Sequence, residues 1–323
     1  MQTVQQMNWE HPLWRTLPLH PQPKPLESLN GYILRLAEAN GLKSVHELAR
    51  LSGLRKGWRD QDSSSIPTGR LAGIARCDPN HLQNMTCYHL ARHFACAGFS
   101  VESTSPFFRG SLASSLRYCP ACLDDQPYYR LTWRFLALRG CVSHGCSLLN
   151  TCGHCLTPIS LLARRPRIAC CPACQGDLRT CSTSPLPQQA RETLEKHARD
   201  LELLLMPAEL APEITSALLQ GSGFFLLRVR RQMGFAEAAR LMGTDEQALE
   251  EIEEGNWGRK ATLADYWRYT EILDCSLSDV IEAAQIMRSS EDERRLKRLA
   301  EAAQLIHLEV AEDLRRSLTE GSR

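Results

Sequence analysis

Near its middle the chain reads Cys119-Pro-Ala-Cys122, Cys141-Val-Ser-His144, Cys152-Gly-His-Cys155 and Cys171-Pro-Ala-Cys174. In each pair, a spacing of two residues lets both side chains turn onto one ion. Thiolates are soft ligands, imidazole is borderline, and sets of four suit the tetrahedral geometry of zinc. The stretch therefore predicts two structural zinc ions, each closed by four protein ligands with no position left for water.

The spacing alone does not fix which pairs share an ion. A sequential arrangement joins the first pair to the second and the third to the fourth, whereas a cross-braced arrangement uses the same ligands in other combinations. We expect the sequential one. Cys170, next to Cys171, and His154, inside the third pair, are the neighbours most easily mistaken for ligands.

Two other uses of the fourteen cysteines fit less well. A disulfide framework needs an oxidising compartment, but residues Met1 to Glu10 are polar and lack the apolar core of a secretory signal. A redox-active Cys-x-x-Cys motif is expected next to a βαβ pattern, which the sequence does not show. We therefore expect a cytoplasmic protein, and no membrane association, because no apolar run is long enough to span a bilayer.

The charge of the chain is distributed unevenly over its 323 residues, a length that suggests two or three domains. Residues 1–190 carry 20 Lys and Arg against 11 Asp and Glu, a net charge of +9, and residues 191–323 carry 18 against 26, a net charge of −8. The basic front half favours nucleic acid or an acidic partner. The acidic back half argues against phosphate contact there.

The first 110 residues divide into an arm and a helical domain. Residues 1–25 are expected to be extended, because several prolines disfavour a helix. This arm carries Trp9 and Trp14, which either offer a surface to a partner or pack on the following domain. Residues 26–110 are expected to form a helix-turn-helix-like bundle, since apolar residues recur at helical spacing and Asp78-Pro79 is typical of a helix start.

The remaining chain is predicted to hold a tandem zinc-finger region, residues 111–181, and a C-terminal helical domain, residues 191–323. In the zinc region, Arg164, Arg165 and Arg167 form a basic loop that either contacts phosphates or is only solvated. The fold class expected for the whole chain is mostly α.

Within the C-terminal domain, residues 223–287 look like a lambda-repressor-type module with a helix-turn-helix. Its would-be recognition helix, Asp245 to Glu254, carries six acidic side chains. These repel DNA and favour protein docking over base reading. Beyond it, an apolar stripe from Leu296 to Leu318 either pairs two chains into a homodimer as a coiled coil or covers the module.

Two stretches carry a resemblance to a known family. Pro25-Leu-Glu-Ser-Leu-Asn-Gly-Tyr-Ile-Leu-Arg-Leu-Ala-Glu-Ala-Asn-Gly41 looks like the opening signature of the TniQ family. So does Arg117-Tyr-Cys119-Pro-Ala-Cys122-Leu, followed by Trp133, Cys141-Val-Ser-His144-Gly and Cys152-Gly-His-Cys155. The resemblance covers about residues 18–180, over half the chain.

The TniQ family supplies target-selection proteins of multi-component transposons, including CRISPR-associated ones. The resemblance implies an adaptor, not an enzyme, that links a target-recognition complex to a TnsC-type AAA+ ATPase, which then recruits the transposase. That complex is a CRISPR effector (Cascade), with DNA and RNA in the assembly, or the target is a fixed DNA site. The acidic C-terminal half favours a protein-mediated target. The resemblance also implies that the arm with Trp9 and Trp14 contacts the ATPase.

Two rival functions stay open at the level of sequence. A sequence-specific DNA-binding regulator, or an attachment-site-binding protein, would act through the helix-turn-helix modules, and salt-sensitive binding by residues 223–287 would indicate one. A zinc enzyme would need an open coordination position. The chain shows no P-loop, catalytic carboxylate cluster or nucleophile–base pair.

Overall fold

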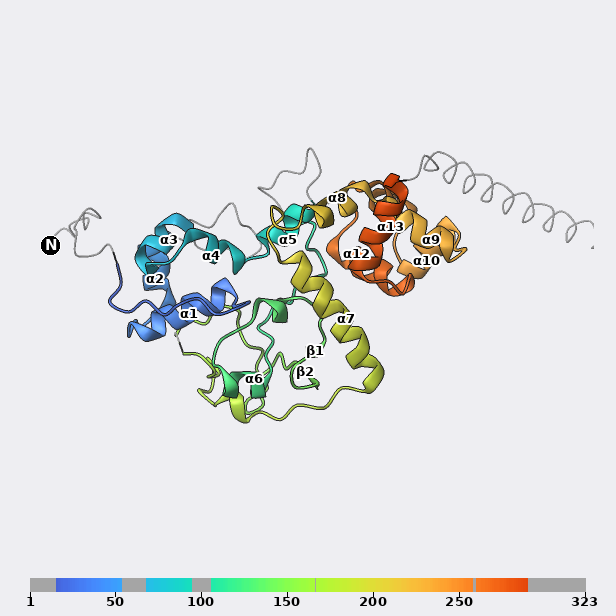
Figure 1. The fold of residues 1–323 in the computed structure, drawn as a ribbon. Helices are drawn as coiled ribbons and strands as arrows, with labels where there is room; N and C mark the ends of the chain where they lie inside the picture. Colours follow the sequence, from blue (N-terminus) through green and yellow to red (C-terminus); the bar gives the residue numbers. More distant parts are fainter. Residues whose placement is uncertain (1–15, 54–67, 95–105, 166, 258–259, 290–323) are drawn as a thin grey trace, which may run out of the picture. The chain divides into compact units, whose positions relative to one another are not determined.

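A computed structural model describes residues 16–53, 68–94, 106–165, 167–257 and 260–289 (Figure 1). These residues are mostly helical, as predicted. The chain divides into two compact units, Met1–Arg92 with Gly98–Ala211, and His93–Ala97 with Pro212–Arg323. Trp9, Trp14 and the stripe from Leu296 to Leu318 lie outside the described residues. None of the helices in the described ranges is long and apolar enough to cross a membrane.

Short helices and turns make up most of the first unit. It opens with α1 (Leu29–Ala39), α2 (Val45–Ser52), α3 (Thr68–Ala75), α4 (Pro79–Asn84) and α5 (Tyr88–His93). The cysteine-rich region follows with α6 (Pro120–Asp125), the 3₁₀ turns Leu131–Arg134 and Leu178–Thr180, and the two-residue strands β1 (Gly140–Cys141) and β2 (Cys146–Ser147), which pair antiparallel. The long helix α7 (Gln188–Leu204) closes the unit.

The segment before α1 is hydrogen-bonded to the cysteine-rich region. Ser28 N–H donates to the Tyr129 carbonyl over 2.8 Å, and Leu131 N–H donates to the Leu26 carbonyl over 2.7 Å. The Ser28 hydroxyl also caps α1 by accepting the Gly31 N–H at 3.1 Å. A Cβ on Gly31 would lie 3.0 Å from the Tyr129 Cβ. Glycine therefore lets the two segments approach closely.

A buried ion pair fixes the same segment to α1. The Glu27 side chain is fully buried and accepts hydrogen bonds from Arg35 Nε at 2.8 Å and Nη2 at 2.7 Å. Arg35 Nη2 also donates to the Gln22 carbonyl at 2.7 Å. A two-pronged guanidinium–carboxylate contact of this kind fixes orientation as well as distance. The residues that resemble the TniQ opening signature thus join the first helix to the region that holds the cysteines.

One hydrophobic core runs from the N-terminal helices into the cysteine-rich region. Its buried residues include Leu29 and Leu36 of α1, together with Tyr129, Trp133 and Leu178 of the later segment. Small metal modules bury little apolar area by themselves, so shared aromatic side chains supply what they lack. The helices and the cysteine pairs therefore fold as one body.

Helix α7 belongs to the first unit, although we predicted one C-terminal domain from residue 191. Leu194, Leu201 and Leu204 lie on one side of the helix and are buried. The helix packs on the cysteine-rich region: His197 Nδ1 lies 3.4 Å from the Ala137 carbonyl, and Figure 1 shows α7 beside β1 and β2. These contacts place the start of the second unit at Pro212. The finer boundaries, 1–25, 26–110 and 111–181, stay predictions.

Six helices make up the described part of the second unit. Its helices are α8 (Pro212–Gln220), α9 (Ser222–Arg230), α10 (Phe235–Met242), α11 (Glu246–Glu254), α12 (Leu263–Ile272) and α13 (Leu277–Ser289). Phe224 stacks on Tyr269 at a centroid distance of 5.4 Å in the core, and buried Trp257 donates its indole N–H to the Leu218 carbonyl. The helix expected from Asp245 to Glu254 is α11, and the likeness to a lambda-repressor module stays a prediction.

Candidate metal centres

The structure gathers the eight predicted ligands into two groups of four. The first group is Cys119, Cys122, Cys141 and His144, and the second is Cys152, Cys155, Cys171 and Cys174. In each group the candidate ligand atoms all lie within 4.8 Å of one another. The grouping is the sequential one, and each group can hold a metal ion.

The first group has the spacing that a tetrahedral zinc ion requires. Bonds of about 2.3 Å to sulfur and about 2.0 Å to nitrogen place two sulfurs about 3.8 Å apart, and a sulfur and a nitrogen about 3.5 Å apart. His144 Nδ1 lies 3.6 Å from Cys119 Sγ, 3.3 Å from Cys122 Sγ and 3.5 Å from Cys141 Sγ. The Sγ atoms of Cys122 and Cys141 are 3.4 Å apart. These residues therefore fit the ion.

Two different local structures supply the first group. Cys119 is the N-cap of α6, with Pro120 in the first turn of the helix, and its sulfur lies 3.5 Å from the Cys122 N–H. Cys141 ends β1 and is followed by a tight turn, closed by a 2.8 Å bond from the Gly145 N–H to the Cys141 carbonyl. Gly145 has a φ of +58°, which glycine adopts without strain.

Asp125 orients the histidine of the first group. The Asp125 carboxylate lies 3.2 Å from His144 Nε2, while Nδ1 faces the three thiols. A carboxylate on the outer nitrogen fixes the ring and its tautomer and makes the inner nitrogen a better ligand. The spacing of the ligand pairs does not point to Asp125, although this acid follows the ligand Cys122 by three residues.

The second group is built from two turns of the same form. Leu156 N–H donates to the Cys152 carbonyl at 2.8 Å, and Gln175 N–H donates to the Cys171 carbonyl at 2.9 Å. Leu156 and Gln175 both have positive φ, 59° and 62°. The Sγ atoms of Cys152 and Cys174 are 3.7 Å apart, as are those of Cys155 and Cys171. These distances match the edge of a tetrahedron around zinc.

Backbone N–H groups point at the sulfurs of the second group. His154 N–H lies 3.4 Å from Cys152 Sγ, and Gly176 N–H lies 3.4 Å from Cys174 Sγ. Hydrogen bonds from Thr157 lower the pKa of the Cys155 thiol to about 6. Donors of this kind favour the thiolate, which is the form that binds a metal.

The mutual contacts in the first group have opposite effects on two thiols. The hydrogen bond with Cys122 lowers the pKa of Cys119, and the same contact raises the pKa of Cys122. The contact therefore favours a thiolate at Cys119 and a protonated thiol at Cys122. Neighbouring thiolates repel, and a divalent cation between them removes that repulsion.

The residues most easily mistaken for ligands have other roles. His154 Nε2 lies 2.9 Å from the Asp177 carbonyl and 3.2 Å from the Thr180 hydroxyl. Cys170 is in neither group of four. Cys181 accepts the Gly153 N–H at 3.3 Å, so it supports the third cysteine pair without joining the group.

Buried Arg117 supports the chain just before the first group. It donates to the carbonyls of Phe135 and Leu138. Burial lowers the pKa of its guanidinium to about 10. Two carbonyl acceptors compensate for the lost hydration of this buried cation.

The basic loop is exposed at all three arginines. Arg164, Arg165 and Arg167 point outward, while the Arg164 carbonyl accepts the Val45 N–H at 3.0 Å. The loop is thus tied to the start of α2 and presents its guanidinium groups to solvent. Contact with nucleic acid stays a prediction.

On helix α11 of the second unit, fewer acidic side chains are exposed to solvent than the sequence suggests. Glu251 is buried and accepts the N–H groups of Lys260 and Ala261 at 2.7 and 2.9 Å. Glu253 pairs with Arg228 at 2.7 and 2.8 Å, with both side chains 8 % exposed. Burial lowers the pKa of Arg228, but Glu253 outweighs this and the pKa is raised. These two glutamates hold the unit together.

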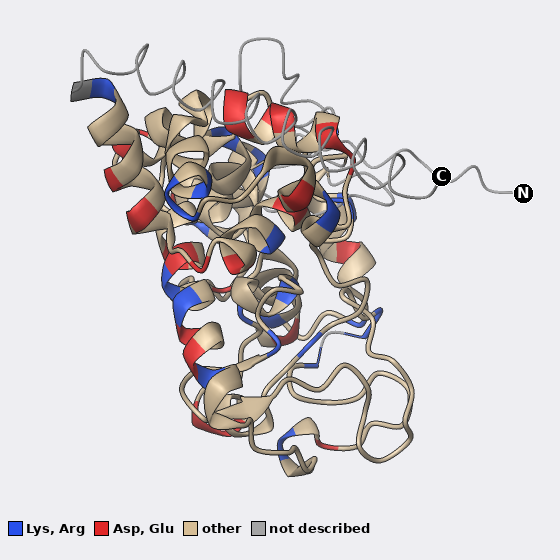
Figure 2. Ribbon diagram, turned by 90° about the vertical axis from the view of Figure 1, so that its right-hand side faces the viewer, with Lys and Arg blue, Asp and Glu red and all other residues tan. Residues whose placement is uncertain are grey.

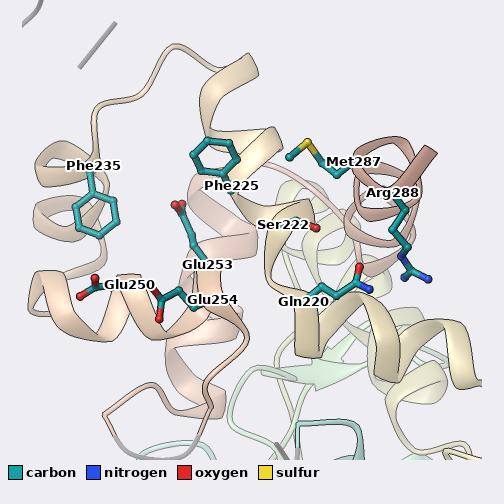
Figure 3. Close-up of a pocket in the computed structure, with 9 residues that line it drawn as sticks. All are labelled: Gln220, Ser222, Phe225, Phe235, Glu250, Glu253, Glu254, Met287 and Arg288. Atoms are coloured by element: carbon teal, nitrogen blue, oxygen red, sulfur yellow. The ribbon is translucent and has the colours of Figure 1, made fainter. Parts of the chain in front are cut away.

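A cavity of about 510 Å³ lies beside two exposed acids of α11 (Figure 3). Glu250 and Glu254 of α11 line it together with Phe225, Phe235 and Met287. Apolar rings next to exposed carboxylates form a surface suited to a basic, partly apolar protein segment. Figure 2, in which Asp and Glu are red, shows further acidic positions on the helices.

A comparison with known protein families finds a match in the first unit, over the N-terminal helices and the first ligand group. A model of the TniQ family matches residues 18–148, which include α1 to α6 and the whole first group of ligands. No curated protein matches the chain in sequence. The segment before α1, the helices α1 to α6 and the first candidate metal centre therefore form one TniQ domain, and over these residues the chain is similar to the TniQ family.

Proposed function

We propose that this protein is a target-selection adaptor of a multi-component transposon. The TniQ family is associated with transposon target selection, and the match over residues 18–148 is the observation that carries the proposal. The adaptor links a target-recognition complex to a TnsC-type AAA+ ATPase, which recruits the transposase. It performs no chemistry of its own.

The metal in both centres is zinc, and its role is structural. Tetrahedral spacing, soft thiolate ligands and four protein ligands per group support this assignment. When bound, each ion supplies folding free energy to a region with little apolar core. Because the first group shares a core with α1 to α4, the ions also fix the surface that the N-terminal helices offer to a partner.

The second unit supplies a protein-docking surface. Glu246, Glu250 and Glu254 are exposed on α11, and they repel the phosphates of DNA. Arg228 of the neighbouring helix α9 is buried against Glu253, so its guanidinium is not available to a DNA phosphate. An acidic docking surface favours a protein-bound, RNA-guided target over direct reading of a fixed site.

The loop of Arg164, Arg165 and Arg167 contacts nucleic acid within the assembly. Three exposed cations on an anchored loop support this. Alanine at all three positions is expected to weaken binding of the chain to duplex DNA uniformly across sequences and to flatten its salt dependence. If the salt dependence of DNA binding did not change, the three arginines would be only solvated and would not contact nucleic acid.

A co-sedimentation experiment tests the adaptor role. The cognate TnsC-type ATPase, assembled on DNA with ATP, is expected to carry the full chain into the pellet. Substitution of both Trp9 and Trp14 by Ala is expected to weaken this recruitment while leaving metal content unchanged. Leu19→Ala, which removes an exposed apolar side chain of the same arm, is the matched control and is expected to have no effect. Absence of any association by the wild-type chain would refute the adaptor role.

A further inference from the structure

Cys146 lies against the first metal centre although it belongs to neither group of four. Its Sγ atom is 3.6 Å from Cys119 Sγ, close to the edge expected between two ligands of one tetrahedral ion. The residue is 7 % exposed. Nothing in the two-residue spacing of the sequence pairs points to it, because Cys146 follows His144 after only one residue.

We propose that Cys146 is an alternative fourth ligand of the first metal centre, which binds the ion in place of His144 when the imidazole leaves it. The backbone already holds it next to the site, since Cys146 pairs with the ligand Cys141 across the β1–β2 ladder. Residues opposite each other in such a ladder have Cβ atoms about 5 Å apart. The sulfur can therefore reach the ion through a change of side-chain rotamer, without a change of fold.

His144 is the ligand that is easiest to replace. Cys119, Cys122 and Cys141 are buried, whereas His144 is exposed. Its outer nitrogen rests on Asp125, whose side chain is 65 % exposed. His144 is therefore the ligand of this group that is most accessible to water, whereas the thiol of Cys146 is buried.

The exchange has a definite chemical consequence. Three thiolates, one neutral imidazole and Zn²⁺ carry a net charge of −1, whereas four thiolates and Zn²⁺ carry −2. Cys146 loses its thiol proton to solvent when it binds, and no oxidant or reductant is involved. The inference rests on the metal occupancy proposed above for the first group.

Cobalt substitution in the full chain tests the exchange. We compare the wild type, His144→Ala, Cys146→Ser and the double variant, measuring bound cobalt per chain and the thiolate-to-cobalt charge-transfer absorption. His144→Ala is expected to keep two cobalt ions, with an absorption that rises as seven thiolate ligands become eight. Cys146→Ser is expected to match the wild type, and the double variant to lose one cobalt.

Each other outcome counts against the exchange. Loss of one cobalt from His144→Ala, with or without loss of fold, would show that Cys146 does not replace the histidine. Retention of two ions by the double variant would show an open three-cysteine site instead. A wild-type chain that binds no cobalt in the first group would overturn the metal proposal itself, a result distinct from failure of the exchange.

Discussion

The buried pair of Glu27 and Arg35 permits a quantitative test of how the TniQ domain is held together. Glu27→Gln keeps the shape of the side chain and removes its charge. Breaking a buried ion pair by removing one partner costs about 3–5 kcal/mol. Here the Arg35 side chain is 16 % exposed and still has the Gln22 carbonyl as an acceptor, so we expect a loss at or just below the lower end of this range, about 2–3 kcal/mol.

A loss of this size is large enough to measure at single amides. Since about 1.4 kcal/mol is a factor of ten, the opening constant of α1 is expected to rise about thirty- to a hundred-and-fiftyfold. Native-state hydrogen exchange at the buried amides of Leu36 and Ala37 reports that constant directly. Metal content is expected to stay at the wild-type value, because neither centre loses a ligand.

A matched control separates burial from charge. Arg179 and Asp177 form an ion pair in the same unit, at 2.6 Å, but their side chains are 46 % and 35 % exposed. Arg179→Ala is expected to change stability far less than Glu27→Gln, because solvent screens an exposed pair. If Glu27→Gln cost no more than this control, the buried pair would not be what joins the signature segment to α1.

Three further predictions test other parts of the structure. Cys122→Ser is expected to release one metal ion and unfold the first centre, seen as one zinc fewer per chain by elemental analysis. Asp125→Asn is expected to weaken metal affinity at the same centre at least about tenfold, measured by chelator competition; unchanged affinity would mean that the carboxylate does not support His144. Gly255 and Gly243 both have positive φ, so alanine costs each about 1 kcal/mol. A Cβ at Gly255 would also lie 2.0 Å from the Leu219 carbonyl, so Gly255→Ala is expected to cost at least about 2 kcal/mol more than Gly243→Ala in urea unfolding.

The sequence by itself determined the features that depend on short-range pattern. Spacing of two residues identified the cysteine pairs, and Asp78-Pro79 indicated a helix start that the structure contains. Helix caps and ligand pairs can be predicted from a few consecutive residues, because the atoms that interact belong to residues only a few positions apart.

Only the tertiary structure decided which distant groups meet. Glu27 gains its partner through the fold, Asp125 and Cys146 reach the first centre through α6 and β2, and α7 joins the first unit by packing on it. The acids of α11 show the limit of a sequence pattern most clearly. A run of glutamates suggests one charged face, but burial converts Glu251 and Glu253 into internal hydrogen-bond acceptors and leaves the others to solvent. The reason is physical: a carboxylate is buried only where other segments bring donors to it, and sequence spacing does not specify those segments.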